Sequence, residues 1–323
     1  MKSLSLLILS LASASAMSAA QAASTVSASA SITGLTLTLV DLDPLDGIAP
    51  SVTFGSYGYY DNYGYASASQ YDGSNYGYDG IDFGSTTTNP WTPGAASANS
   101  GAASAAASLT GNGSIDGSSL LTSGSATAVG FASCTATYPY QSCGQPYASF
   151  GAQVTTPYYY YSGTITVSAN TLVLIEAQGA VAASAEGGGM AQTFDYQNLP
   201  YTYYYGNSAS ASLGLSISGP AASGSGGGSQ SSSDALSMSS YTYWDGAHWL
   251  SYGYGSTTTS GSLGVSFVNA SDADMLAAFN ASTYISGYAY GDSVAAVPEP
   301  GTYAMLMAGL LSIGAVVRRR RPG

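Results

Sequence analysis

Few residues in this chain have side chains suited to chemistry, and their spacing limits what each can do. Cys134 and Cys143 are the two cysteines, nine positions apart. In an oxidising compartment such a pair forms one disulfide that closes a short loop, which stabilises a fold by roughly 2.7 kcal/mol in the chain-entropy description. Two thiols without histidine partners make a poor zinc site. We therefore predict a disulfide, with a free or regulatory thiol pair as the alternative.

Three acidic residues, Asp41, Asp43 and Asp46, lie just before Gly47. Calcium prefers clustered carboxylates, and an EF-hand loop has acids at positions 1, 3 and 5, glycine at 6 and glutamate at 12. Here the third acid and the glycine each come one residue late, and Val52 occupies the glutamate position. The spacing favours an acidic turn after a strand, with a weak calcium site as the alternative. We expect no cofactor.

Catalytic groups are scarce. His248 is the one histidine, and no serine lies in a G-x-S-x-G nucleophile elbow. A glycosidase needs two carboxylates about 5 to 10 Å apart, and the middle of the chain offers two glutamates, Glu176 and Glu186, besides its aspartates. We expect no enzymatic activity, and a polysaccharide hydrolase is the least favoured alternative.

Aromatic clusters are the most suggestive feature, because the chain has 28 tyrosines and 3 tryptophans. Most clusters are interrupted by Gly, Asn or Asp, which predicts loops or strand ends. Tyrosine could simply replace charge as the amphipathic surface residue, or it could make a binding surface by stacking on sugars or on neighbouring molecules. The residues we select as candidate ligand contacts are Tyr241, Tyr243, Trp244 and Trp249. The clusters span 57–65, 71–78, 158–161, 201–205 and 241–254.

Charge excludes other classes of function. Only 7% of residues are charged, and the five basic residues are Lys2 and Arg318–Arg321. Sixteen of the 17 acidic residues lie in the region 23–297, which has no Lys or Arg, and the other is Glu299. Nucleic-acid binding needs cations that displace phosphate counterions, so we exclude it.

The N-terminal end has the pattern of a targeting segment. Lys2 precedes a short apolar stretch, Leu4–Ala12, and Ala20-Gln21-Ala22 matches the A-x-A cleavage pattern of signal peptidase. The apolar run is too short to span a bilayer of about 30 Å. We predict a Sec signal peptide over residues 1–22, removed by signal peptidase.

The C-terminal end combines Val297-Pro298-Glu299-Pro300, an uncharged stretch from 301 to 317, and Arg318, Arg319, Arg320 and Arg321. Seventeen helical residues reach about 26 Å, the low end for a transmembrane helix. The arginines predict that the helix ends on the cytoplasmic side, which places the rest of the chain outside the cytoplasm.

These three parts resemble the PEP-CTERM sorting signal, also known as the ice-binding protein C-terminal domain. The resemblance covers about 27 residues and implies that an exosortase recognises the Pro-Glu-Pro motif and removes the helix and arginines. It also implies the envelope of a Gram-negative bacterium that makes exopolysaccharide. We therefore expect a precursor anchored in the inner membrane, then delivery to the outer surface or extracellular matrix.

The region 23–296 is long enough for one large β domain. Apolar residues alternate with serines over Ser208–Ser218, as a half-buried strand requires. In Thr25–Val40 the apolar phase changes at Gly34, which predicts a β-bulge. We also expect a hairpin over Thr164–Ala185, and an Asp245-Gly246 turn between two aromatic strands.

The expected fold is an antiparallel β-sandwich or jelly-roll-like domain with long Gly-, Ser- and Tyr-rich loops. The low-complexity stretches Ala95–Ser108 and Gly219–Ser233 are expected to be mobile loops. The favoured function is a non-enzymatic surface or matrix protein sorted by an exosortase. The alternative is a carbohydrate-binding module, with or without the assistance of calcium, and with exopolysaccharide or self-association as the binding event.

Overall fold

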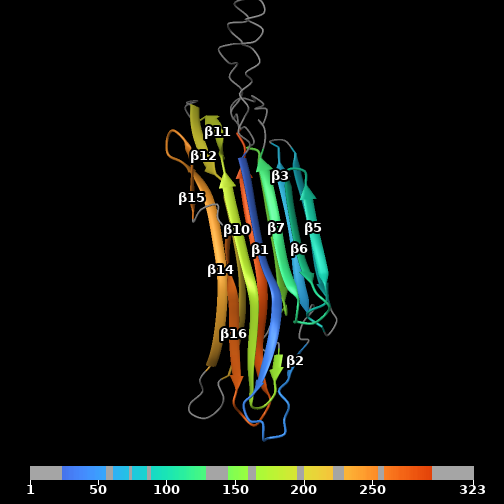
Figure 1. Cartoon of the computed structure of the whole chain (residues 1–323). Helices are drawn as coiled ribbons and strands as arrows, with labels where there is room; N and C mark the ends of the chain where they lie inside the picture. The colour runs from blue at the N-terminus through green and yellow to red at the C-terminus, as the bar shows by residue number, and fades with distance from the viewer. Residues whose placement is uncertain are drawn as a thin grey trace, which may run out of the picture.

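The computed structural model describes residues 24–55, 61–72, 75–85, 89–128, 145–158, 165–194, 200–220, 229–253 and 258–292. Within these ranges the chain is all β, without a helix, and every strand pair is antiparallel. Two large sheets pack face to face in an elongated sandwich (Figure 1). The predicted all-β antiparallel class is therefore confirmed. The signal peptide, the tail 297–323 with its expected helix, and both cysteines lie outside the described residues.

One layer is a six-stranded sheet, and it faces the viewer in Figure 1. Its first strand in the chain lies in the middle, hydrogen-bonded to strands from distant parts of the sequence. In spatial order the sheet contains β16 (Thr258–Asn269), β10 (Thr171–Glu186), β1 (Ser24–Asp41), β7 (Ser119–Ala128), β6 (Ala103–Thr110) and β5 (Gly94–Ser100).

The other layer is a nine-stranded sheet whose central strand is the last strand of the chain. Its main path runs through β15 (Trp249–Gly253), β14 (Ser229–Trp244), β13 (Ser208–Pro220), β17 (Met275–Tyr290), β8 (Tyr147–Thr156), β3 (Asn62–Tyr71) and β4 (Tyr76–Ser85). Two short strands, β2 (Val52–Phe54) and β9 (Ile165–Val167), extend it beside β17. A separate hairpin, β11 (Gly188–Phe194) and β12 (Pro200–Gly206), lies at one end of the sandwich.

The long strand β1 shows how sequence pattern becomes structure. Its buried side chains occupy even positions up to Ile32 and continue at Leu35. Pairing with β10 shifts between Thr33 and Thr36, and Gly34 takes a φ of 63° that other residues rarely adopt. The predicted β-bulge is confirmed, and it keeps the apolar side chains of both halves on the inner face.

Small side chains dominate the core between the sheets, with a few large ones filling the space. Buried alanines line the inner faces of most strands. The Phe150 ring of β8 lies where a Cβ on Gly124 of the opposite sheet would come within 2.3 Å of it. A Cβ on Gly287 of β17 would lie 2.5 Å from the same ring. These two glycines therefore make the room that the ring fills.

Two predicted loops are wrong in whole or in part. The stretch Ala95–Ser108 forms most of β5 and β6, with Ala96, Ala98 and Ala105 buried. Period-two alternation decides its structure, because each buried alanine faces the core even though it buries little area. In Gly219–Ser233, β13 continues to Pro220 and β14 starts at Ser229, and the residues between lie outside the described ranges.

Two predicted hairpins also change. The strands expected in Thr164–Ala185 exist as β9 and β10, but they do not pair: β9 bonds β2 and β17, whereas β10 bonds β1 and β16. The continuous apolar run Leu172–Ile175 predicts a strand that is buried on both faces, but in β10 one face is only half-buried, at Leu172 and Leu174. The aromatic hairpin is confirmed, but its loop has four residues because Trp244 pairs with Trp249.

The edge of β16 is closed by side chains of the other sheet. Asp234 accepts a hydrogen bond from the Gly264 amide at 3.1 Å, and Ser232 and Gln230 accept from the amides of Ser266 and Val268. On the opposite side of the sandwich, Asp79 of β4 accepts from the Asn99 amide of β5 at 2.7 Å. Amides at both lateral borders therefore have partners inside the molecule.

Candidate functional site

Eleven tyrosines lie on one surface, the outer face of the nine-stranded sheet. They occupy alternate positions of their strands, opposite in phase to the buried residues, so they point away from the core. We call this surface the tyrosine face: Tyr63, Tyr65 and Tyr71 of β3, Tyr76 and Tyr78 of β4, Tyr147 of β8, Tyr241 and Tyr243 of β14, and Tyr284, Tyr288 and Tyr290 of β17.

Four of these tyrosines stand in register across four neighbouring strands. Tyr76 pairs with Tyr71, Tyr71 with Tyr147, and Tyr147 with Tyr290. The ring centroids of Tyr71 and Tyr147 are 6.0 Å apart, and those of Tyr147 and Tyr290 are 6.4 Å apart. Tyr205 of β12 continues the line, 5.3 Å from Tyr290. We call these five residues the tyrosine row.

The rings of the row influence one another. Burial raises the pKa of the Tyr147 phenol, and its neighbour Tyr76 raises it further, through charge and a side-chain hydrogen bond. Burial also raises the pKa of Tyr290, helped by Tyr288 and Tyr205. Each effect favours the neutral phenol. Tyr147 and Tyr290 therefore keep their phenol hydroxyls, which can donate hydrogen bonds.

A second group of rings lies further along the same face. Tyr63 contacts Tyr158 with centroids 4.9 Å apart, and Tyr65 at 6.2 Å. Burial raises the pKa of Tyr65, with Tyr284 as the next cause. Between this group and the row runs a band of serine and glycine, including Ser67, Ser286 and Gly151.

Hydroxyls fill the spaces between rings, and charge is nearly absent. Ser69 and Ser149 hydrogen-bond at 2.7 Å, and Ser210 and Ser286 at 2.8 Å. Along the described strands, Asp82 is the sole charged side chain on this face. On the six-stranded sheet, the described outer positions hold no aromatic residue, and they are mainly serine, threonine and alanine with Glu176 and Glu186. The sandwich therefore has two chemically different faces.

The structure brings the two candidate tryptophans together rather than leaving them open. Tyr204 stacks on Trp244 at 4.9 Å with an interplanar angle of 4°, and Trp249 meets both rings edge to face. Trp249 also lies against the backbone of Gly188, where a Cβ would come within 2.5 Å. The tryptophans thus join the β11–β12 hairpin to β14 and β15.

The two candidate tyrosines of the same hairpin have a different setting. Tyr241 and Tyr243 are each 42% exposed and lie on the tyrosine face. The turn between the hairpin strands holds Asp245, whose carboxylate accepts from the amides of His248 and Ala247 at 2.7 Å each. These bonds lower the pKa of Asp245. They fix the four-residue loop, in which His248 is exposed.

The acidic turn after β1 uses its carboxylates for local structure. Asp43 donates its amide to the Asp41 carboxylate at 3.0 Å, and Ile48 donates to Asp46 at 2.7 Å. The Asn170 side chain donates to Asp46 at 2.8 Å, and this bond is the main cause of a lowered pKa for Asp46. Among the residues described, no three His, Cys, Asp or Glu side chains are grouped as metal ligands.

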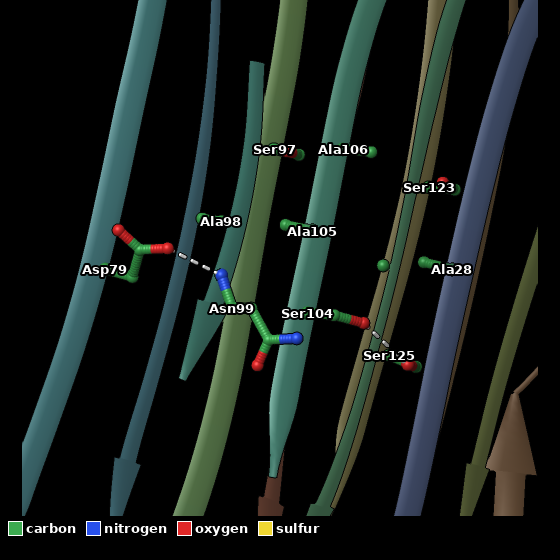
Figure 2. A pocket seen from close by; sticks show the side chains of 11 residues that line it. Ala28, Asp79, Ser97, Ala98, Asn99, Ser104, Ala105, Ala106, Ser123 and Ser125 are labelled. Carbon is green, nitrogen blue, oxygen red and sulfur yellow. Dashed lines mark hydrogen bonds between the residues drawn. The ribbon is translucent and has the colours of Figure 1, made fainter. Parts of the chain in front are cut away.

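A groove of about 490 Å³ runs over β5, β6 and β7 (Figure 2). It is lined by alanine, serine and glycine together with Asn99 and Asp79. Figure 2 shows the Asp79 carboxylate bonded to the Asn99 amide and Ser104 bonded to Ser125 at 3.2 Å. The one carboxylate is therefore already engaged, and the groove offers no acid pair for hydrolysis.

Comparison with known proteins identifies the C-terminal end. Residues 296–321 match the family model of the PEP-CTERM protein-sorting motif, which includes Pro298, Glu299, Pro300 and Arg318–Arg321. The motif implies exosortase-type processing, export and membrane-associated sorting toward the cell surface. No curated protein and no solved structure matches the chain. In the described ranges no helix is both long and apolar enough to cross a membrane.

Sequence reasoning found the aromatic hairpin but missed the row. Its signal was present in the spacing, since Tyr63 and Tyr65, Tyr76 and Tyr78, and Tyr288 and Tyr290 are each two residues apart, as one face of a strand requires. The glycines around Tyr63, Tyr65, Tyr76 and Tyr78 made these segments resemble turns. The prediction was loops or strand ends: the loops are wrong where the strands are described, whereas Tyr76 does lie at a strand end.

Proposed function

We propose that the protein is a non-enzymatic component of the bacterial surface or exopolysaccharide matrix, delivered there by exosortase sorting. The sorting motif at 296–321 is the observation that carries the proposal, because it assigns a route and a destination. Export by Sec through the signal peptide 1–22, and a precursor held by a helix over 301–317, belong to the same proposal. A large, rigid sandwich with few charges is consistent with a structural role outside the cell.

The chemistry of the described residues supports a role without catalysis. Some exposed carboxylates, among them those of Asp46 and Asp245, hold backbone amides in turns. The sole histidine is exposed at the tip of a hairpin. A nucleophile, a base and an orienting group are not assembled from these side chains. A hydrolase remains testable, because it releases reducing ends from the polymer that surrounds the cell.

The sorting part is tested in the native host by deleting Pro298–Pro300. We expect the deletion variant to keep its tail, which raises the mass of the accumulated protein, and to remain with the membrane fraction. Pro322→Ala is the control, since it lies one residue beyond the matched range. If the deletion leaves both mass and location unchanged, exosortase sorting of this protein is wrong.

A second candidate function, a carbohydrate-binding surface protein, is favoured by the tyrosine face. Aromatic rings present flat apolar surfaces, and phenol and serine hydroxyls lie between them. Sugar rings combine apolar C–H faces with hydroxyl edges, so the two surfaces are complementary. The proposal predicts saturable binding that soluble sugar displaces, without release of reducing ends.

A further inference from the structure

We propose that the tyrosine row binds a neutral polysaccharide chain that lies across the strands, at right angles to them. This inference rests on the proposed carbohydrate-binding function and assigns it a site, a direction and a class of ligand. The residues are Tyr76, Tyr71, Tyr147, Tyr290 and Tyr205, from β4, β3, β8, β17 and β12.

The five rings of the row lie along a line, and this arrangement matches an extended polymer chain. Neighbouring strands are about 4.8 Å apart, so the four in-register tyrosines span about 14 Å. Tyr205 extends the line by a further 5.3 Å beyond Tyr290. Beside the row lies a second line in register, in which Tyr78 of β4 and Tyr288 of β17 flank two serines of β3 and β8. The position on β17 after Tyr288, toward the centre of the face, is Ser286. A chain of sugar rings follows such a line, one or more units for each aromatic side chain.

Each side chain of the row keeps solvent-exposed surface that a ligand can reach. Tyr76 at the border of the sheet is 61% exposed, and Tyr71, Tyr147, Tyr205 and Tyr290 are part-exposed. The neighbouring ring planes from Tyr71 through Tyr147 and Tyr290 to Tyr205 are tilted by 36°, 55° and 39°, so these pairs do not stack face to face. This differs from Trp244, whose ring is covered by Tyr204 at an angle of 4°.

The charge of the protein favours a neutral polysaccharide over an acidic one. The region 23–297 has no Lys or Arg, so an acidic polysaccharide meets no cation there. The acidic excess of the chain repels such a polymer. The raised pKa values of Tyr147 and Tyr290 favour their neutral phenols, and the face around them has hydroxyls such as those of Ser149 and Ser69 as hydrogen-bond partners. Neutral sugars are bound through stacking and hydroxyl contacts, which this surface supplies.

A second copy of the chain fits the row less well. A stable protein interface buries about 800 Å² per partner around an apolar centre. The tyrosine row, with Tyr78 and Tyr288 beside it, is instead separated from the other rings of the face by a band of serine and glycine that includes Gly151 and Ser67. Self-association through this face is therefore an alternative outcome of the test.

The experiment uses the protein isolated from its host after sorting, and measures retardation in native gels that contain a soluble neutral glucan, a mannan or an alginate. The row variant is Tyr71→Ala with Tyr147→Ala, and the control is Tyr65→Ala with Tyr284→Ala on the same face. Removing stacking by one ring weakens binding by about three- to tenfold. We expect a loss of at least tenfold for the row variant, and less than threefold for the control.

Each other outcome overturns the inference. No retardation by either neutral polymer, or stronger retardation by alginate, rules out a neutral ligand. An equal loss in the control pair rules out the row as the site. Tyr147→Phe keeps the ring and is expected to retain most of the binding, which separates lost stacking from a folding defect. If light scattering shows that the row variant changes self-association but not sugar binding, the face is a protein interface.

These results are independent of the sorting experiment. A failure of the row leaves the mass and location of the Pro298–Pro300 deletion variant as they were. A failure of sorting leaves sugar binding by the folded sandwich unchanged. The two proposals can therefore fail separately.

Discussion

Adding one methyl group at Gly124 should destabilise the whole sandwich. A Cβ there lies 2.3 Å from Cδ2 of Phe150, whereas ordinary contact begins at 3.4 Å, so the ring has to move by about 1.1 Å. It cannot retreat freely, because the same ring lies against Gly287 in its own sheet, where a Cβ would come within 2.5 Å. Gly124→Ala therefore tests how tightly the two sheets are fitted to each other.

The magnitude follows from two opposing terms. Overpacking a rigid core costs about 1 to 3 kcal/mol, and the confined ring places this site near the upper value. Replacing glycine by alanine in a strand returns about 0.5 to 1 kcal/mol, since the unfolded chain loses freedom. The net loss in the free energy of unfolding is about 2 kcal/mol. For a domain of this size that corresponds to a fall in melting temperature of about 4 to 8 °C.

Thermal and urea unfolding of the sorted protein measure this loss. The matched control is Gly261→Ala on β16, where a Cβ meets nothing within 4 Å, and it should be neutral or slightly stabilising. Adding Phe150→Leu to Gly124→Ala should recover at least about 1 kcal/mol relative to the sum of the single changes. If Gly124→Ala melts at the temperature of Gly261→Ala, the ring is not confined as the structure indicates.

Three further predictions concern single contacts. Asn170→Gly keeps the left-handed backbone of Asn170 (φ 47°) but removes its side-chain hydrogen bond to Asp46, so the lowered pKa of Asp46 should rise toward 3.8 in a carboxyl NMR titration. The stabilisation from this bond is present above pH 3.8 and is lost as the pH falls through the lowered pKa of Asp46. Tyr76→Phe removes the side-chain hydrogen bond to Tyr147 and should lower the raised pKa of Tyr147 toward 10.0 in an alkaline titration followed by absorbance. In the wild type, the stabilisation linked to this raised pKa is complete below pH 10.0 and is lost as the pH rises through the raised pKa. An unchanged titration contradicts the hydrogen bond. Asp234→Ala should speed hydrogen exchange at the Gly264 amide, whereas Asp272→Ala, an exposed acid in a turn, should not.

Local patterns predicted much of the secondary structure. The alternation in Ser208–Ser218 and the phase change at Gly34 each report which side of one strand is buried, and this information is contained within a few neighbouring residues. The loop prediction for Ala95–Ser108 was wrong because it rested on the low-complexity composition and not on the period-two alternation of the alanines. Alanine buries too little area to be recognised as core, but in β5 and β6 it faces the other sheet as regularly as valine does elsewhere.

Pairing between distant strands could not be predicted in this way. The strand β10 bonds β1 and β16, which lie far from it in sequence, and nothing in Thr164–Ala185 specifies those partners. The tyrosine row could not be predicted for the same reason. Tyr71, Tyr147 and Tyr290 lie far apart in the sequence and become neighbours only through the register of strand pairing. The sorting motif, by contrast, is continuous in the chain, so it was predicted from sequence and the family comparison confirms it.

The central position of β17 decides how the protein resists mechanical force. The sorting tail continues from the end of this strand, which is bonded along its length to β13 on one side and to β8 on the other. A pull on the tail along the strand axis loads these hydrogen bonds together in shear, so they must break almost at once rather than peel apart one by one. While the precursor is still held by its expected C-terminal helix, a force acting through this end therefore meets the strongest direction of the sheet, and the lifetime under tension depends on the rate of unfolding.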